Sequence, residues 1–256
     1  MKTWSRYGPT GWGRKAVDAV ANLIWPPVSP LSDQPVSAPG LVDAQAWSQI
    51  DFLDAPWCSA CGFPFQYDAG EVVCAACAAR PPSLETVRSV FAYGDDSRQL
   101  ILDFKHGGRT DALKQFGRWM ARSGADALDG ADIIIPVPLH HRRLFTRRYN
   151  QSALLGQSLA RETGIGFDAG ILKRSKATPT QGGRSARGRK RNVAGAFQVR
   201  RTAKPSIAAK RLVLVDDVIT TGATLEACAR TLLRAGAKKV NAVTLSRVVR
   251  PVDTLT

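Results

Sequence analysis

The chain of 256 residues has no long apolar run and few acidic side chains. Its longest apolar stretches, such as residues 133–139, fall far short of the ~20 residues that a membrane-spanning helix needs. The basic N-terminal segment lacks the small-residue cleavage site of a secretory signal. We therefore expect a cytoplasmic protein without a membrane span.

Histidine occurs three times, as His106, His140 and His141, and none stands in a recognised catalytic spacing. The sequence therefore names no general base and no acceptor substrate. Two common nucleotide-binding motifs, GxGxxG and GxxxxGK followed by Ser or Thr, are also missing. Their absence excludes ATPases of the P-loop type and dinucleotide-binding folds.

The chain has 21 acidic residues and 36 lysines and arginines, which gives a net charge of +15. This charge implies an anionic partner. Nucleic acid, a membrane surface and a polyphosphate metabolite are the candidates. The densest basic runs, residues 142–148 and 184–191, lie in segments without a regular pattern, which favours a basic pocket over a groove. A merely solvated basic face is the alternative.

The order of predicted elements indicates an α/β fold, a parallel sheet flanked by helices, beside a small N-terminal module. Short apolar segments predict strands at residues 86–93, 133–137, 212–215 and 240–245. Apolar residues three and four apart predict helices at residues 97–104, 113–128, 150–162 and 224–235. Because parallel sheets bind ligands at the carboxyl ends of their strands, we expect a site in the loops after residues 135 and 215.

Four of the five cysteines form two CxxC pairs, Cys58 with Cys61 and Cys74 with Cys77, with twelve residues between the pairs. This spacing is typical of two tight turns that present four thiolates to one tetrahedral Zn²⁺. Four protein ligands leave no position for water, so the zinc is expected to be structural. Disulfides are the alternative, which a reducing cytoplasm disfavours. On its predicted helix Cys228 is expected to be a buried thiol.

A predicted strand, residues 212–215, runs through Asp216 and Asp217 into a short loop that opens a helix. Small residues and a glycine allow backbone N–H groups to approach a phosphate there, and the helix N-terminus adds positive potential. The two carboxylates are suited to the hydroxyls of a ribose and to hydrated Mg²⁺. The loop residues that would bind the phosphate are Thr220, Thr221, Gly222, Ala223 and Thr224.

This thirteen-residue run, 212–224, resembles the signature by which type I phosphoribosyltransferases bind phosphoribosyl pyrophosphate (PRPP). Further segments resemble the ComF family of competence-associated proteins, a zinc ribbon joined to a phosphoribosyltransferase domain. These segments are Pro136-Val137-Pro138-Leu139-His140, Tyr149-Asn150-Gln151, residues 178–181 and residues 191–197. The resemblance divides the chain into residues 1–56, an N-terminal helix, a linker and a degenerate first ribbon; residues 57–84, the zinc ribbon; and residues 85–250, the phosphoribosyltransferase-like domain.

The resemblance also implies roles for single residues. Asp216 and Asp217 would bind the ribose hydroxyls, and residues 220–224 the 5′-phosphate, with Mg²⁺ accompanying PRPP. The loop Pro136, Val137, Pro138 and Leu139 would bind pyrophosphate, with help from Arg142 or Arg143. The basic segment 178–192 would close as a lid, and a disordered basic loop is the alternative.

The chain departs from the family pattern at two places. Val42 and Gln45 stand where many members carry thiolates of a first ribbon, so one zinc ion is expected and not two. Arg184 stands where the lid segment is expected to have a leucine.

Three functions remain open on the sequence alone. The first is transfer of a phosphoribosyl group to an unidentified acceptor. The second is a PRPP- or nucleotide-sensing protein that binds DNA during uptake without transferase activity. The third is a zinc-stapled interaction module with a vestigial pocket.

Overall fold

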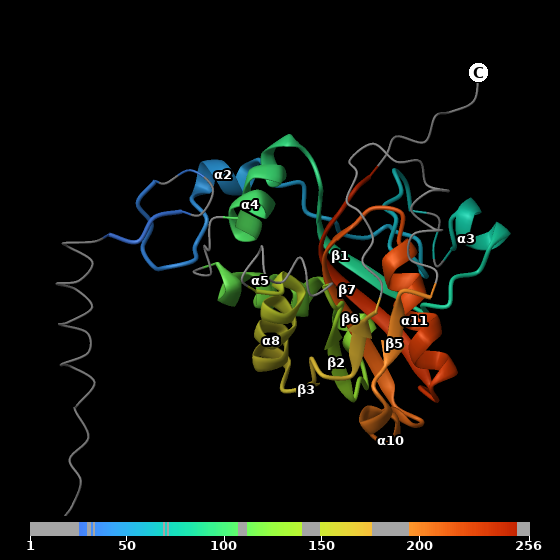
Figure 1. The fold of residues 1–256 in the computed structure, drawn as a ribbon. Helices are drawn as coiled ribbons and strands as arrows, with labels where there is room; N and C mark the ends of the chain where they lie inside the picture. The colour runs from blue at the N-terminus through green and yellow to red at the C-terminus, as the bar shows by residue number, and fades with distance from the viewer. Residues whose placement is uncertain are drawn as a thin grey trace, which may run out of the picture.

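The computed structural model describes residues 26–106, apart from 30, 31, 33, 69 and 71, and then residues 112–139, 149–175 and 195–249. Five strands form a parallel sheet in the order β1-β7-β6-β2-β3 (Figure 1). Their bounds are β1 Val87–Ala92, β2 Ile133–Pro136, β3 Gly166–Phe167, β6 Arg211–Ile219 and β7 Lys239–Arg247. The predicted α/β fold with a parallel sheet is confirmed.

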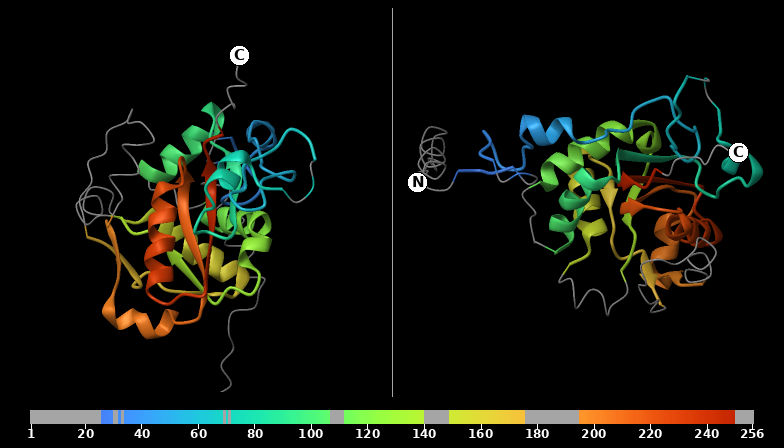
Figure 2. Two further views of the ribbon diagram at one scale, coloured as in Figure 1. Left: turned by 90° about the vertical axis from the view of Figure 1, so that its right-hand side faces the viewer. Right: turned by 90° about the horizontal axis from the view of Figure 1, so that it is seen from above.

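Helices cover both faces of this sheet. Seen from above in Figure 2, the green α5 and the yellow α8 lie on one side and the orange-red α11 on the other. The first face also carries α4 and α6, and the second carries the antiparallel pair of β4 and β5 with the short η1 and α10. Their bounds are α4 Asp95–His106, α5 Leu113–Ser123, α6 Ala125–Leu128, α8 Gln151–Thr163, β4 Leu172–Arg174, β5 Phe197–Val199, η1 Arg201–Ala203, α10 Lys204–Ile207 and α11 Ala223–Arg234.

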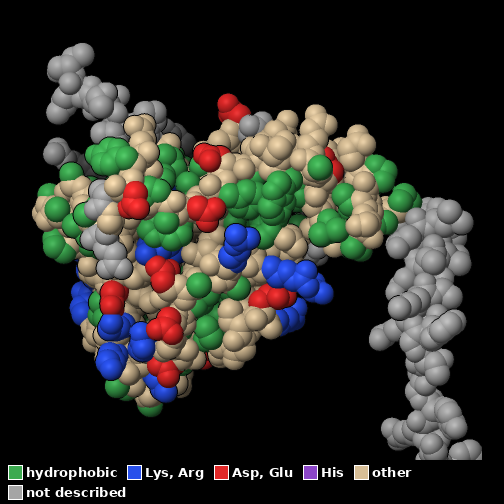
Figure 3. Space-filling view, turned by 180° about the vertical axis from the view of Figure 1, so that it is seen from behind, with side chains coloured by type: hydrophobic (Ala, Val, Ile, Leu, Met, Phe, Trp, Pro, Cys, Tyr) green, Lys and Arg blue, Asp and Glu red, His purple; other side chains and the backbone are tan. Residues whose placement is uncertain are grey.

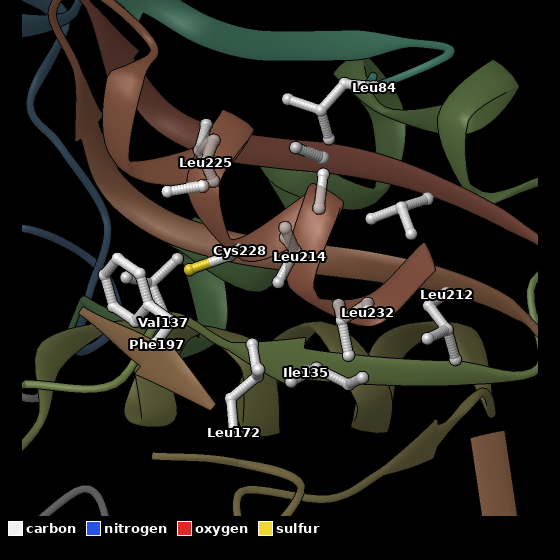
Figure 4. Close-up of a cluster of buried hydrophobic side chains, with 14 of the residues drawn as sticks. Leu84, Ile135, Val137, Leu172, Phe197, Leu212, Leu214, Leu225, Cys228 and Leu232 are labelled. Carbon is white, nitrogen blue, oxygen red and sulfur yellow. The ribbon is translucent and has the colours of Figure 1, made fainter. Parts of the chain in front are cut away.

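Strand β6 shows how the sequence builds the two layers. Successive side chains of a strand point to opposite faces. Leu212 and Leu214 therefore pack toward α11, in the cluster drawn in Figure 4, whereas Val213 and Val215 pack toward α5 and α8. All four side chains are buried, as a strand covered on both faces requires.

Two predicted elements differ markedly from the observed ones. The helix expected at residues 113–128 is divided into α5 and α6 at Gly124, where a Cβ atom would lie 2.7 Å from Cγ2 of Val243. The backbone approaches the sheet so closely here that only glycine, which has no Cβ atom, fits at position 124. The strand expected at residues 212–215 continues to Ile219, so that both acidic residues lie inside β6.

The segment that leads into the first cysteine pair, residues 51–61, covers the outer edge of β1. Leu53 donates its N–H to the carbonyl of Val90, Ala92 donates to Asp51, and Val87 donates to Ala60. An edge strand otherwise presents unpaired backbone groups, and these bonds satisfy them. Two five-residue helices flank the contact, α2 Ala44–Ser48 and α3 Ala75–Ala79.

No helix in the described part of the chain is long and apolar enough to cross a membrane. The N-terminal helix expected before residue 26 lies outside the described residues.

Candidate functional site

The two acids stand next to each other in β6, both half-buried. Oδ1 of Asp216 accepts a hydrogen bond from Oγ of Ser152 at 2.8 Å and another from the N–H of Asp217 at 3.0 Å. Oδ1 of Asp217 accepts from the N–H of Val218 at 2.7 Å. Bonds to backbone donors and to a neighbouring helix hold the two carboxylates in fixed orientations.

The predicted phosphate loop directly follows β6. Thr220 and Thr221 are exposed, and Gly222 is the N-cap of α11 with φ of 70°. Only glycine adopts this left-handed conformation without steric cost. No side chain caps this end of α11 among the described residues, so its first-turn N–H groups are not taken by a capping oxygen. The loop has the geometry of an anion-binding helix N-terminus.

The second predicted loop, residues 136–139, begins at the end of β2, beside Val215 of β6. Pro136 pairs with Val215 in the sheet, and the N–H of Val137 donates to the carbonyl of Val215 at 2.9 Å. The side chain of Asn150 donates to the carbonyl of Val137 at 3.1 Å. The structure thus brings together the acids, residues 220–224 and residues 136–139 at the carboxyl ends of β2 and β6. Arg142, Arg143 and the segment 178–192 lie outside the described residues.

Two residues in contact with this site, Asn150 and Ser152, received no role from the sequence. Asn150 is the N-cap of α8, and its side-chain oxygen accepts from the N–H of Ser152. An asparagine directly before a helical pattern is a capping signal that the sequence did contain. Nothing in the sequence indicated that Ser152, in the first turn of α8, would contact Asp216.

Cys228 lies on α11 with its side chain fully buried. Burial raises the pKa of this thiol well above its usual value, with a further contribution from the negative charge of Asp216. A neutral, buried thiol is not a nucleophile at neutral pH. The expected burial of Cys228 is confirmed.

The four remaining cysteines meet in one cluster. Their sulfur atoms lie within 4.8 Å of one another, and Sγ of Cys61 is 3.7 Å from Sγ of Cys74. Ligands about 2.3 Å from a tetrahedral Zn²⁺ are separated by about 3.8 Å, so the cluster fits one such ion. Among the described residues no second group of this kind occurs. Val42, where the family resemblance leads one to expect a thiolate, is partly buried and packs against the apolar core on the α5 and α8 side of the sheet.

Backbone N–H groups stabilise the thiolate form of Cys58. The N–H groups of Cys61 and Cys74 point at Sγ of Cys58, at 3.4 and 3.2 Å. Burial raises the pKa of Cys58, but these bonds outweigh it and lower the pKa to about 7. Burial raises the pKa of Cys61 to about 11 and raises that of Cys77 as well. These values apply without metal, and a bound cation would deprotonate all four thiols.

Two buried arginines from the sheet, Arg88 and Arg247, contact the same turn, and neither contact is indicated by a local sequence pattern. Nη2 of Arg247 donates to the carbonyl of Cys61 at 2.7 Å, and burial lowers the pKa of this guanidinium. Nη1 and Nη2 of Arg88 both donate to the carbonyl of Ser59 at 3.2 Å. The guanidinium of Arg88 also lies 4.9 Å from the ring centre of Trp57. The cysteine turn is therefore anchored to β1 and β7.

Comparison with known proteins finds one matching family model and several similar solved structures. The family model "Phosphoribosyl transferase domain" matches residues 150–251, which include α8, β6, residues 220–224 and α11. A solved structure of adenine phosphoribosyltransferase covers 58% of this chain and 75% of its own, with 16% identity and a TM-score of 0.34.

Two curated relatives match most of the chain. Competence protein F of Haemophilus influenzae is 35% identical over 197 residues, 75% of this chain and 85% of the relative. DNA utilization protein YhgH of Escherichia coli strain K12 is 33% identical over 207 residues, 79% of this chain and 88% of the relative. With this identity over most of both sequences, the chain belongs to the ComF/YhgH family of competence proteins and carries a phosphoribosyltransferase domain.

Proposed function

We propose that the chain binds PRPP at the carboxyl ends of β2 and β6 and transfers its phosphoribosyl group to an acceptor that is not yet identified. In this proposal Asp216 and Asp217 bind the ribose hydroxyls and residues 220–224 bind the 5′-phosphate. Residues 136–139 bind the pyrophosphate, with Arg142 or Arg143 adding charge.

One observation carries the proposal. Two oriented carboxylates and an uncapped helix N-terminus lie on a single continuous segment, with only Val218 and Ile219 between Asp217 and the loop. Carboxylates accept hydrogen bonds from sugar hydroxyls, whereas the N–H groups of α11 attract an anion. A ligand that fits both must have a diol and a phosphate side by side, as a phosphorylated ribose has.

The reaction itself would form one bond and break one. A lone pair of the acceptor attacks C1 of PRPP as the bond from C1 to the pyrophosphate oxygen breaks, and pyrophosphate leaves with the bonding electrons. Asp216 and Asp217 would hold a hydrated Mg²⁺ bound with PRPP, and this ion would supply positive charge for the leaving pyrophosphate. The backbone N–H of Leu139 is suited to hold the departing pyrophosphate, because that of Val137 already donates to the carbonyl of Val215.

The cysteine cluster is proposed to hold one structural Zn²⁺. Four thiolate ligands close the coordination sphere, so the ion would stabilise the segment around the cluster and take no part in transfer. The buried guanidinium of Arg247 beside the cluster supports this, because it compensates the negative charge of a tetrathiolate site.

Calorimetric titration with PRPP and Mg²⁺ tests the binding site. The double variant Asp216→Asn with Asp217→Asn should lose PRPP binding and keep its fold. Asp132→Asn is the matched control, because Asp132 accepts from the N–H of Arg211 at the opposite end of β6. Equal affinity of the wild type and the double variant would refute the site. Acceptor-dependent release of pyrophosphate, assayed with a panel of bases and amines, would then establish an enzyme.

DNA binding is the second candidate function. The net charge of +15 favours it, and several relatives are named DNA utilization proteins. The face shown in Figure 3 carries Lys and Arg intermixed with Asp and Glu, without a single basic stripe. Binding of double-stranded DNA that weakens steeply with salt and persists in the double variant would support this function. PRPP binding without pyrophosphate release would support a sensing role.

A further inference from the structure

Two polar side chains at the start of α8 reach both halves of the proposed site. Nδ2 of Asn150 donates to the carbonyl of Val137 at 3.1 Å, in the loop proposed to bind pyrophosphate. Oδ1 of Asn150 accepts from the N–H of Ser152 at 3.2 Å. Ser152 then donates from Oγ to Oδ1 of Asp216 at 2.8 Å. One continuous series of hydrogen bonds therefore joins the pyrophosphate loop to the first ribose-binding acid.

The helix that carries these two side chains is firmly anchored. Leu155 and Leu159 are fully buried between α8 and the sheet. Oγ of Ser158 donates to the carbonyl of Leu113 on α5 at 2.6 Å. The hydroxyl of Tyr149, just before the helix, donates to the carbonyl of Phe104 on α4 at 2.9 Å. The start of α8 is thus a fixed reference point for whatever it contacts.

Ser152 itself is nearly fully buried. A buried hydroxyl that donates to a carboxylate forms a charge-assisted bond, which is stronger than a bond between neutral groups. That bond selects one orientation of the Asp216 carboxylate. The weaker, neutral bond from Asn150 fixes the carbonyl of Val137 and with it the course of the loop.

We propose that Asn150 and Ser152 are positioning residues that set the geometry between the ribose and pyrophosphate subsites, an inference that rests on the proposed function. PRPP is recognised by both subsites because its pyrophosphate is attached to C1 of the ribose. Ribose 5-phosphate uses only the subsites for ribose and 5′-phosphate, and free pyrophosphate uses only the loop. The two side chains should therefore affect these smaller ligands differently.

The test compares two variants with a matched control. Ser152→Ala removes the donor to Asp216. Asn150→Ser keeps an oxygen that can cap α8 but removes the amide N–H that reaches Val137. Ser158→Ala is the control, because it deletes a similar buried hydroxyl on the same helix away from the site. Ser152→Thr, which keeps a hydroxyl, should restore the behaviour of the wild type.

Binding of three ligands with Mg²⁺ is measured for each variant. Ser152→Ala should weaken PRPP and ribose 5-phosphate about tenfold and leave pyrophosphate nearly unchanged. Asn150→Ser should weaken PRPP and pyrophosphate about fivefold and leave ribose 5-phosphate nearly unchanged. Equal losses for all three ligands, or losses that match those of Ser158→Ala, would overturn the inference.

Amide hydrogen exchange, measured without ligand, tests the inference independently of the proposed function. Ser152→Ala should speed exchange of the amides of residues 216–218, and Asn150→Ser should speed that of the Val137 and Leu139 amides, whereas Ser158→Ala should affect neither. If the wild type binds no PRPP but the exchange changes as stated, the proposed function fails and the coupling of the two segments stands. If the exchange of both segments is unchanged, the coupling itself is refuted.

Discussion

Arg247 connects the cysteine cluster to the proposed phosphate loop. Its guanidinium donates to the carbonyl of Cys61 at 2.7 Å, and its backbone ends β7 in register with Ile219. Ile219 immediately precedes Thr220, and its carbonyl accepts from the N–H of Val248 at 2.9 Å. A single residue thus contacts the cysteine turn with its side chain and the strand before the proposed phosphate loop with its backbone. A metal ion bound by the cysteines is therefore expected to stabilise more than its own module.

Arg247→Met should weaken metal binding. Loss of the guanidinium leaves the carbonyl of Cys61 without this donor and removes a positive charge near the four cysteine sulfur atoms. Partners of metal ligands typically contribute about 10-fold to 100-fold in affinity, and we expect at least the lower figure. Competition with a chromophoric chelator measures the zinc affinity. Arg230→Met is the control, since Arg230 is an exposed arginine that pairs with Glu226 at 3.7 Å. Equal zinc affinity in both variants would show that Arg247 does not contribute to metal binding.

Cys74→Ser should release the zinc and lower the melting temperature of the whole chain. The cysteine segment pairs with the outer edge of β1, so its loosening exposes backbone groups of the sheet. Metal analysis under reducing conditions and thermal unfolding measure the two effects. Cys228→Ala is the control, because this cysteine lies on α11 and is expected to leave the zinc content at one ion per chain. A wild-type protein without zinc would refute the metal site.

Gly62→Ala should destabilise the protein more than Gly70→Ala does. Both glycines have positive φ, 69° and 76°, so alanine at either position costs about 1–2 kcal/mol of backbone strain. At Gly62 the added Cβ would also lie 2.3 Å from the carbonyl oxygen of Val87, whereas nothing lies within 4 Å at Gly70. The excess loss in free energy of unfolding, measured with denaturant, reports the docking of the cysteine turn on β1. Equal losses would show that this contact is not maintained in solution.

Much of the fold follows from local sequence pattern. Short apolar runs such as residues 133–137 are typical of strands buried on both faces, and the structure places β2 there. The spacing of the four cysteines likewise predicted their cluster, because two CxxC turns bring four sulfur atoms together with few degrees of freedom. In both cases the signal lies within a few residues, which is why sequence alone sufficed.

The missed features depend on contacts between distant segments. Ser152 and Asp216 are 64 positions apart, and Arg247 and Cys61 are 186 apart. A serine in a helix or an arginine at a strand end has no local pattern that names its partner. The extension of β6 through Asp216 and Asp217 was missed for a related reason, since acidic residues disfavour strands and only pairing with β7 places them in one. Tertiary contacts therefore decide how the site is held, whereas local pattern decides where it is.

Gly222→Ala should weaken PRPP binding, whereas Gly164→Ala should not. The two glycines have nearly equal φ, 70° and 73°, at the start of α11 and the end of α8. A Cβ would meet only Ile219 at an ordinary 3.7 Å at Gly222 and nothing within 4 Å at Gly164, so strain alone should cost about 1–2 kcal/mol of stability at both. Relief of that strain shifts the backbone N–H groups of the phosphate loop only in Gly222→Ala. Calorimetry with PRPP measures the affinity, and denaturant unfolding measures the stability. Similar stability of the two variants, with affinity lost only in Gly222→Ala, would support phosphate binding at this loop. Unchanged affinity in Gly222→Ala would place the phosphate elsewhere.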